Sequence, residues 1–283
     1  MLTRSGAAAS IARVVVASWV VLGQAACVTR TVATPAAPWR PPRAATLEEV
    51  VAAYDGYCRG VSTLSAAGDL EVRDLRAGKA RRLGVRVLAG RGGRLYLKGT
   101  VAVVTALEVI ADGRRFWFRV PSKKTVWTGA ADAAVDQSAE SEQAPYYALR
   151  AADLVEALLP EPLTLGADEA LLLDGDAHSF GLSLARLDEG RRGSARRRVQ
   201  VDRETLQPSL DRRYEPAGIP QREVRYSGWR DGSPHHVVVT RPREGLEAEF
   251  TLDEVKTNVT LPERAFAERP AEGYTVVEVG PKA

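Results

Sequence analysis

The chain has 283 residues, of which 45% are hydrophobic and 27% are charged, a composition typical of a folded globular protein. Its 39 Lys+Arg and 36 Asp+Glu residues leave a formal net charge of only +3, which argues against a nucleic-acid-binding protein. Two cysteines and three histidines leave little material for a disulfide framework or a metal site, so we expect no metal and no other cofactor.

The first residues have the features of an export signal. Arg4 and Arg13 occur without any acidic residue, residues 14–23 are uncharged, and the small residues Ala25 and Ala26 precede Cys27. This order of a cationic, an apolar and a small-residue region is typical of a secretory signal peptide. Ten helical residues span about 15 Å, half of a hydrocarbon core of roughly 30 Å. We therefore predict a cleaved signal over residues 1–26 rather than a transmembrane helix.

The end of this signal resembles the lipobox of bacterial lipoproteins. Residues 22–27 read LGQAAC, although Gln24 stands where that pattern usually has an aliphatic residue. The resemblance implies that Cys27 is diacylated, becomes the mature N-terminus and anchors the protein in the outer membrane, facing the periplasm. The alternative is an ordinary signal peptide and a soluble periplasmic protein. Residues 27–45 contain four prolines, and we interpret them as the lipidated N-terminus and an extended tether.

A helix is predicted to begin after Thr46. Thr46 and Glu49 have the spacing of a capping box, an apolar stripe follows, and Gly60 ends the helix. Cys58 lies on this helix, and no histidine lies nearby in the sequence to activate its thiol. With Cys27 lipidated, Cys58 has no partner for a disulfide, so we interpret it as a buried small hydrophobic residue.

From residue 64 to residue 127 the apolar residues recur with a period of two, which predicts antiparallel strands. Turn signals at 77–78, 90–93 and 112–113 separate these strands, and Asp112-Gly113 is a strong hairpin signal. Residues 129–144 are small and acidic and predict a loop. A second helix is predicted before Pro160, and alternating strands then continue to residue 279. The pattern predicts about eleven strands and two helices in one mainly β domain over residues 46–283.

Several short motifs, taken in order, resemble the LolA/LolB superfamily of periplasmic lipoprotein carriers. They are residues 64–72 (LSAAGDLEV), 93–97 (GRLYL), 112–117 (DGRRFW), 124–129 (KTVWTG), 261–266 (LPERAF) and 270–277 (PAEGYTVV). The resemblance covers most of residues 46–280. It implies an open, curved antiparallel half-barrel covered by two or three helices, with a hydrophobic cavity for acyl chains. A wide sheet under so few helices would also leave apolar lining uncovered.

Residues 99–107 (GTVAVVTAL) are uncharged and apolar on both strand faces. Such a segment is either a strand buried on both sides, which we favour, or a protruding apolar loop. In the LolB-like branch the matching connection carries an exposed leucine that meets the membrane, so the resemblance implies membrane or ligand contact here. The candidate contact residues are Val101, Val103, Val104 and Leu107, together with Phe116 and Phe118 from the following strand.

No catalytic arrangement stands out. His235 and His236 are adjacent on a predicted strand and so point to opposite faces, and Asp174, Asp176 and His178 fit a turn better than a metal site. The basic residues at 191–198 are interpreted as a solvated hairpin turn, with anionic lipid headgroups as the alternative.

We therefore predict a non-enzymatic outer-membrane lipoprotein that binds acyl chains and takes part in lipoprotein or lipid transfer. The first alternative is a sensor or scaffold lipoprotein of the same fold with a filled cavity, and the second is an envelope enzyme whose site is too diffuse to identify from the sequence.

Overall fold

The computed structural model describes residues 43–133, 150–187 and 193–280. The chain divides into residues 1–41 and 42–283, and all described residues belong to the second unit. No helix within these described ranges has the length and apolarity needed to cross a membrane.

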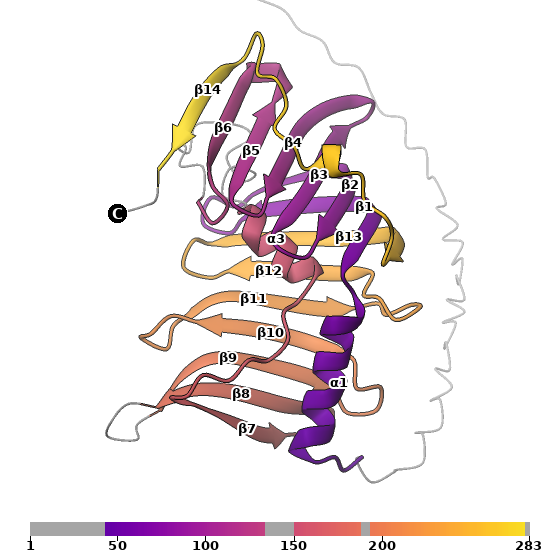
Figure 1. The fold of residues 1–283 in the computed structure, drawn as a ribbon, viewed down its shortest axis with the longest axis vertical. Coiled ribbons are helices and arrows are strands. Elements are labelled where there is room, and N and C mark those ends of the chain that lie inside the picture. The colour runs from indigo at the N-terminus through magenta and orange to yellow at the C-terminus, as the bar shows by residue number, and fades with distance from the viewer. Residues whose placement is uncertain (1–42, 134–149, 188–192, 281–283) are drawn as a thin grey trace, which may run out of the picture. The chain divides into compact units, whose positions relative to one another are not determined.

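The described residues form one large, curved antiparallel sheet of fourteen strands (Figure 1). Two runs of consecutive hairpins, β1 to β6 and β7 to β13, are joined where β1 pairs with β13. The short β14 pairs in parallel with β6. The sheet is not closed, because β14 and β7 lie at its two ends. The strands are β1 (Thr63–Asp74), β2 (Lys79–Gly90), β3 (Arg94–Val101), β4 (Val104–Asp112), β5 (Arg115–Val120), β6 (Thr125–Ala130), β7 (Glu169–Gly175), β8 (Ser179–Leu187), β9 (Gly193–Asp202), β10 (Pro208–Tyr214), β11 (Pro220–Ser227), β12 (His236–Arg241), β13 (Leu246–Thr257) and β14 (Thr275–Val279).

This open half-barrel is the architecture that the LolA/LolB resemblance implies, but its fourteen strands exceed the expected eleven. Two of the additional strands lack a clear alternating pattern. In β7 the run Leu171-Leu172-Leu173 is apolar on both faces, and in β10 the side chain of Asp211 is buried. Alternation identifies a strand only when one face is apolar and the other polar.

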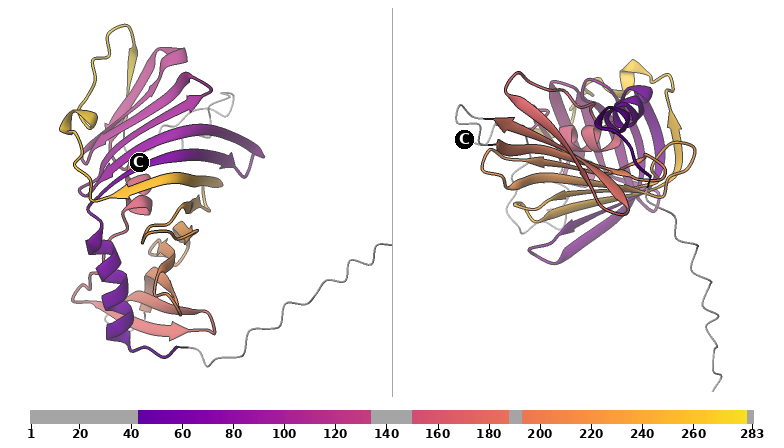
Figure 2. Two further views of the ribbon diagram at one scale, coloured as in Figure 1. Left: turned by 90° about the vertical axis from the view of Figure 1, so that its right-hand side faces the viewer. Right: turned by 90° about the horizontal axis from the view of Figure 1, so that it is seen from below.

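Within the described part of the chain, two α-helices lie on the concave side of the sheet (Figures 1 and 2). The first is α1 (Leu47–Gly60), whose N-cap Thr46 and third helical residue Glu49 form the predicted capping box. The second is α3 (Ala151–Leu158), which ends before Pro160 as predicted. Short 3-10 helices occur at Pro121–Lys123 and Glu263–Ala265.

Each helix covers its own apolar cluster. The larger cluster joins the inward-facing residues of β1 to β6 and β11 to β13 with α3 and the residue after it, and Leu154 and Leu159 are almost fully buried there. The smaller cluster joins α1, including Val50 and Cys58, to β8 and β9. The prediction that Cys58 is a buried small hydrophobic residue is confirmed.

The C-terminal segment covers part of the convex face. Ala271 and Tyr274 pack against a small cluster that contains Ile110, Trp117 and Val126. The extended stretch predicted near the end of the chain is β14, which follows this contact. The C-terminal segment and the two helices therefore pack on opposite faces of the sheet.

Candidate functional site on the concave face

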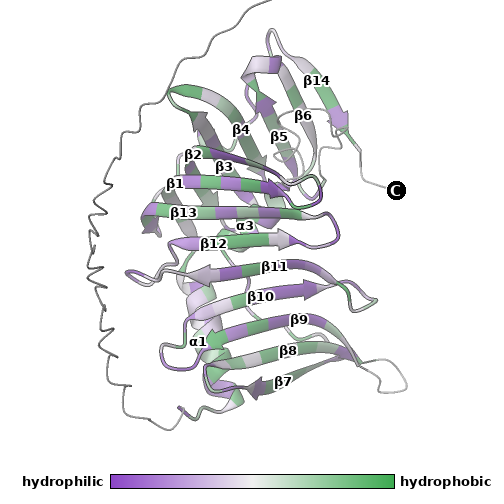
Figure 3. Ribbon diagram, turned by 180° about the vertical axis from the view of Figure 1, so that it is seen from behind, coloured by the Kyte–Doolittle hydropathy of each residue, from purple (hydrophilic) through white to green (hydrophobic). Residues whose placement is uncertain are grey.

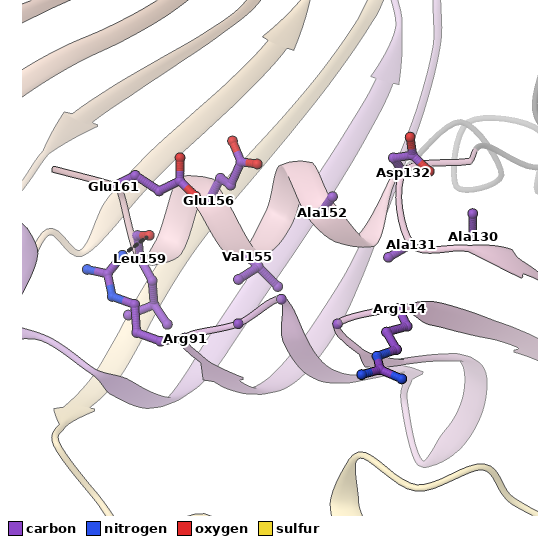
Figure 4. A pocket seen from close by; sticks show the side chains of 13 residues that line it. Arg91, Arg114, Ala130, Ala131, Asp132, Ala152, Val155, Glu156, Leu159 and Glu161 are labelled. Carbon is purple, nitrogen blue, oxygen red and sulfur yellow. Dashed lines mark hydrogen bonds between the residues drawn. The ribbon is translucent and has the colours of Figure 1, made fainter. Parts of the chain in front are cut away.

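A pocket of about 390 Å³ opens beside α3 (Figure 4), a volume within the range of small-molecule sites. Its apolar lining comes from α3 and from the end of β6 and the turn that follows it. Charged side chains also line the pocket, and Figure 4 shows Arg91, Arg114, Asp132, Glu156 and Glu161 around the apolar residues. The apolar lining consists of Ala130, Ala131, Ala152, Val155 and Leu159. The pocket thus combines a short apolar surface with charged groups at its edges.

One wall of this pocket is backbone from two tight turns. Gly93 lies in the β2–β3 turn with φ of +79°, and Gly113 lies in the β4–β5 turn with φ of +96°. A Cβ atom on Gly113 would lie 2.0 Å from the carbonyl oxygen of Gly92. Only glycine allows the two turns to approach so closely in this conformation.

Arg91 fastens both helices to the rim of the sheet. Its guanidinium donates to the carbonyl oxygens of Leu159 at 2.9 Å and Pro160 at 2.8 Å, just beyond α3. It also donates to the carbonyl oxygens of Val61 at 3.1 Å and of Cys58 in α1. Charged hydrogen bonds of this kind are stronger than neutral ones. The Arg91 side chain therefore holds residues 159–160, which follow α3 at one end of the pocket, against the sheet.

The acidic residues of α3 bind arginines of the concave face. Asp153 pairs with Arg222 at 3.2 Å and also with Arg241, and Glu156 pairs with Arg222 at 2.6 Å and Arg213 at 3.0 Å. The Arg222 side chain is only 4% exposed. Burial disfavours its charge, but Glu156 and Asp153 outweigh this effect and raise its pKa above the ordinary value. These ion pairs hold α3 over β10 to β12.

A second buried network holds α1. The Arg197 guanidinium donates to Asp211 at 2.7 and 3.0 Å and to the Tyr54 hydroxyl at 2.6 Å. Burial, together with the nearby Asp211, raises the pKa of Tyr54 well above its usual value. Burial also raises the pKa of Cys58 to about 11. The Cys58 thiol therefore stays protonated near neutral pH and is a poor nucleophile.

The concave face differs from the expected uncovered apolar trough. Its apolar side chains are buried under α1 and α3, and the pockets that remain on this side have charged side chains in their linings. A pocket of about 190 Å³ beside the first pocket contains Arg213, Arg222 and Arg241. The two helices cover more of the concave face than expected. Apolar side chains of the sheet pack against them, and buried arginines on the same face form ion pairs or hydrogen bonds that hold the helices in place.

Residues 101–104 form the exposed tip of the β3–β4 hairpin. The exposed fractions are 56% for Val101, 96% for Val103 and 67% for Val104. The favoured interpretation of this segment as a doubly buried strand is therefore wrong for the tip. The turn places Ala102 in the left-handed region, with φ of +53°. A hairpin turn and a buried strand can have equally apolar sequences, so alternation alone cannot separate them.

The other expected contact residues lie elsewhere. Leu107 is 2% exposed, and Phe116 and Phe118 are buried in the large cluster on the inner face of the sheet. The structure therefore brings Val101, Val103 and Val104 together at the surface, but not Leu107 or the phenylalanines. Cys27 lies outside the described residues.

The remaining charged candidates are paired. Arg196, Arg197 and Arg198 contact Glu169, Asp211 and Asp174 respectively, so these three arginines bind carboxylates of the sheet. In the hairpin at 235–236, His236 binds Glu249 at 2.8 Å and His235 contacts the Leu252 carbonyl oxygen at 2.7 Å. Within the described ranges, no group of three or more His, Cys, Asp or Glu residues is placed to hold a metal ion.

The sequence did not indicate the pocket or the ion pairs beside it. Asp153, Arg222 and Arg241 lie far apart in the chain, and each resembles an ordinary surface residue in its local sequence. One signal was available: Arg222, Val224 and Tyr226 share one strand face, so an arginine continues an apolar row. That continuation could have indicated a buried charge.

Comparisons with known proteins add similar structures but no family. No family model and no curated protein sequence matches the chain. The LolA superfamily protein NE2245 from Nitrosomonas europaea aligns with 80% of this chain and 99% of its own, at 12% identity and a TM-score of 0.49. A DUF1329 family protein from Desulfovibrio piger aligns with 77% of this chain and 95% of its own, at 15% identity and a TM-score of 0.48. Such similarity does not identify a ligand.

Proposed function

We propose that this chain is a non-enzymatic cell-envelope protein that binds acyl chains of lipids or lipoproteins beside α3 and contacts a membrane through the β3–β4 tip. The observation that carries the proposal is the exposure of three valines at residues 101–104. Exposed apolar surface is unfavourable in water by roughly 25 cal/mol per Å². A hairpin that exposes valines to solvent is therefore suited to contact an apolar partner such as the interior of a bilayer.

The pocket beside α3 supports the binding half of the proposal. Ala130, Ala131 and Ala152 offer apolar contacts for methylene groups, and the exposed Arg114 also lines the pocket and offers a cation for an anionic end. Binding by burial alone is reversible, because a bilayer offers an acyl chain an equally apolar surrounding. Neither a nucleotide nor a covalent step is needed for uptake or release.

A lipid anchor on Cys27 would keep the domain at the outer membrane. Two or three acyl chains give stable anchoring, at about 0.8 kcal/mol for each buried CH₂. Metabolic labelling with a palmitate analogue should label the wild-type chain but not the Cys27→Ser variant. Absence of label in both would contradict the anchor and favour a soluble periplasmic protein.

The membrane contact is tested by transfer of a fluorescent fatty acid from the full chain to acceptor vesicles. Val103→Glu/Val104→Glu should leave the free energy of unfolding within about 0.5 kcal/mol of wild type, because these side chains are exposed. It should slow transfer at least about tenfold, because charged residues at the tip cannot enter the bilayer. The matched control is Leu172→Glu, an exposed apolar position on the edge strand β7. Equal transfer rates for both variants would contradict the proposal.

A second candidate function is a sensor or scaffold domain, favoured by the extent to which α1 and α3 fill the concave side. Lipid extraction and mass spectrometry of the purified full chain distinguish the two. Bound lipid at near one equivalent supports acyl binding. A chain free of lipid that also fails to take up added fatty acid supports the scaffold.

A further inference from the structure

A groove of about 430 Å³ crosses β13, β1, β2 and β3 on the convex face of the sheet. Two of its lining residues, Arg86 and Lys98, alternate along their strands with Val87 and Leu97, which belong to the larger inner cluster. Successive residues of a strand point to opposite faces, so the two cations point away from the helices. Figure 3 looks at the sheet from this side and shows β13, β1 and β2 next to one another. We call this hollow the convex groove.

Two cations stand directly opposite each other in the convex groove. Arg86 of β2 pairs in register with Lys98 of β3, and cross-strand neighbours of like charge repel each other. The nearby carboxylates of Asp69 and Glu108 are paired with other arginines, at 2.7 and 3.1 Å respectively. Among the residues that the structure describes, neither the Arg86 nor the Lys98 side chain has a hydrogen bond or ion pair. Both cations are therefore open to an anionic ligand.

The opposite wall of the convex groove carries one carboxylate. The register of β1 and β13 shifts between Ala67, which pairs with Glu254, and Gly68, which pairs with Leu252. Asp253 is therefore the extra residue of a bulge, a feature that redirects side chains. It lines the groove and is exposed. Within the described ranges its carboxylate has no hydrogen bond or ion pair, so it is open to a cationic group.

Small residues form the floor between these two walls. From β1 only Ala67 and Gly68 line the groove, and Gly84 of β2 lies two residues from Arg86 on the same face. Neighbouring strands are about 4.8 Å apart, so the backbones of β13 and β2 lie about 10 Å apart on either side of β1. The floor thus leaves room for a small group with a negative charge on one side and a positive charge on the other.

The convex groove lies at the base of the β3–β4 hairpin. Thr100 lines it, and the exposed valines of the hairpin tip follow in the chain, beginning with Val101. Figure 3 shows this apolar tip in green. A bilayer that receives the tip therefore brings its headgroups close to the groove.

We infer that the convex groove binds the phosphoethanolamine headgroup of a phospholipid. Arg86 and Lys98 bind the phosphate, and Asp253 accepts hydrogen bonds from the primary ammonium group. Hydrogen bonds between charged groups are stronger than neutral ones. A phosphate alone would leave Asp253 facing an anion, and a quaternary ammonium group has no N–H to donate. The inference rests on the membrane contact proposed above and adds the lipid class.

The first test is co-sedimentation of the full chain carrying Cys27→Ser with vesicles of phosphatidylcholine, alone or mixed with phosphatidylethanolamine or phosphatidylglycerol. Phosphatidylethanolamine should raise the partition about tenfold above phosphatidylcholine alone. Arg86→Gln/Lys98→Gln should abolish this preference. Asp253→Asn should also abolish it and should strengthen binding to phosphatidylglycerol, because the groove then carries two cations and no carboxylate.

The matched control is Arg230→Gln/Arg264→Gln, which removes two exposed positive charges outside the groove and should keep the preference for phosphatidylethanolamine. Equal partition of the parent chain into vesicles with and without phosphatidylethanolamine would overturn the headgroup site and leave the membrane contact standing. So would an unchanged preference in the Arg86→Gln/Lys98→Gln variant.

The second test uses soluble glycerophosphoethanolamine and does not depend on a membrane. Heteronuclear NMR of the glycine-labelled full chain follows the amide of Gly84, identified with Gly84→Ala, whose Cβ would make only ordinary contacts. This signal should shift with glycerophosphoethanolamine and much less with glycerophosphocholine or inorganic phosphate. An equal shift with inorganic phosphate, or no shift at all, would overturn the headgroup site. A specific shift without binding to any vesicle would support the groove and contradict the membrane contact.

Discussion

At the scale of single residues, the concave face owes its character to arginines in positions where alternation predicts apolar side chains. Arg197, Arg222 and Arg241 are buried, and each is paired with a carboxylate. A buried charge is tolerated only when a partner offsets its loss of hydration. These three arginines also bind side chains of α1 and α3. They therefore determine where the helices lie on the sheet and contribute to the stability of that contact.

We predict that Asp211→Ala lowers the free energy of unfolding by about 3–5 kcal/mol, because Arg197 would be left buried without its partner. Replacing both residues, with Arg197→Met and Asp211→Leu, should recover much of the loss. Urea denaturation of the full chain measures both effects. The control is Asp168→Ala, which breaks an exposed pair with Arg186 and should cost less than about 1 kcal/mol. Similar losses at Asp211 and Asp168 would contradict this account of the network.

At the scale of elements, the sequence predicted helix starts and turns that depend on interactions between residues close together in the chain. The capping pair Thr46 and Glu49 predicted the start of α1, and Asp112-Gly113 predicted the β4–β5 turn. Both depend on contacts within a few residues. The β3–β4 turn was missed because its apolar sequence resembles a buried strand. The strand β10 was missed because Asp211 faces the interior, a placement that depends on Arg197 in another strand.

The two glycine turns beside the pocket give a prediction at this scale. Gly113→Ala should destabilise the chain by at least about 1 kcal/mol more than Gly78→Ala. Both glycines have positive φ, but only a Cβ on Gly113 would meet another backbone atom, the carbonyl oxygen of Gly92. Thermal or urea unfolding of the two variants compares them directly. Equal losses would show that the two turns can separate without cost.

At the scale of the whole molecule, the proposed acyl binding and the proposed membrane contact use two different surfaces of the half-barrel. The pocket beside α3 is small and has an apolar lining near charged side chains, whereas the β3–β4 tip is open and apolar. The sequence predicted the open sheet through the order of its motifs. It could not predict the size of the cavity, because that depends on how far α1 and α3 fill the trough. If the pocket binds acyl chains as proposed, its volume of about 390 Å³ suits one chain rather than several.

The most direct test of acyl binding is a titration of the full chain with a dansyl-labelled fatty acid, followed by competition with unlabelled palmitate. We predict saturable binding near one equivalent that Ala152→Glu weakens at least about tenfold, since this residue lines the pocket and is not fully buried. The exposed control Ala217→Glu should bind as wild type does. Absence of saturable binding, or equal affinity of the two variants, would contradict an acyl site beside α3.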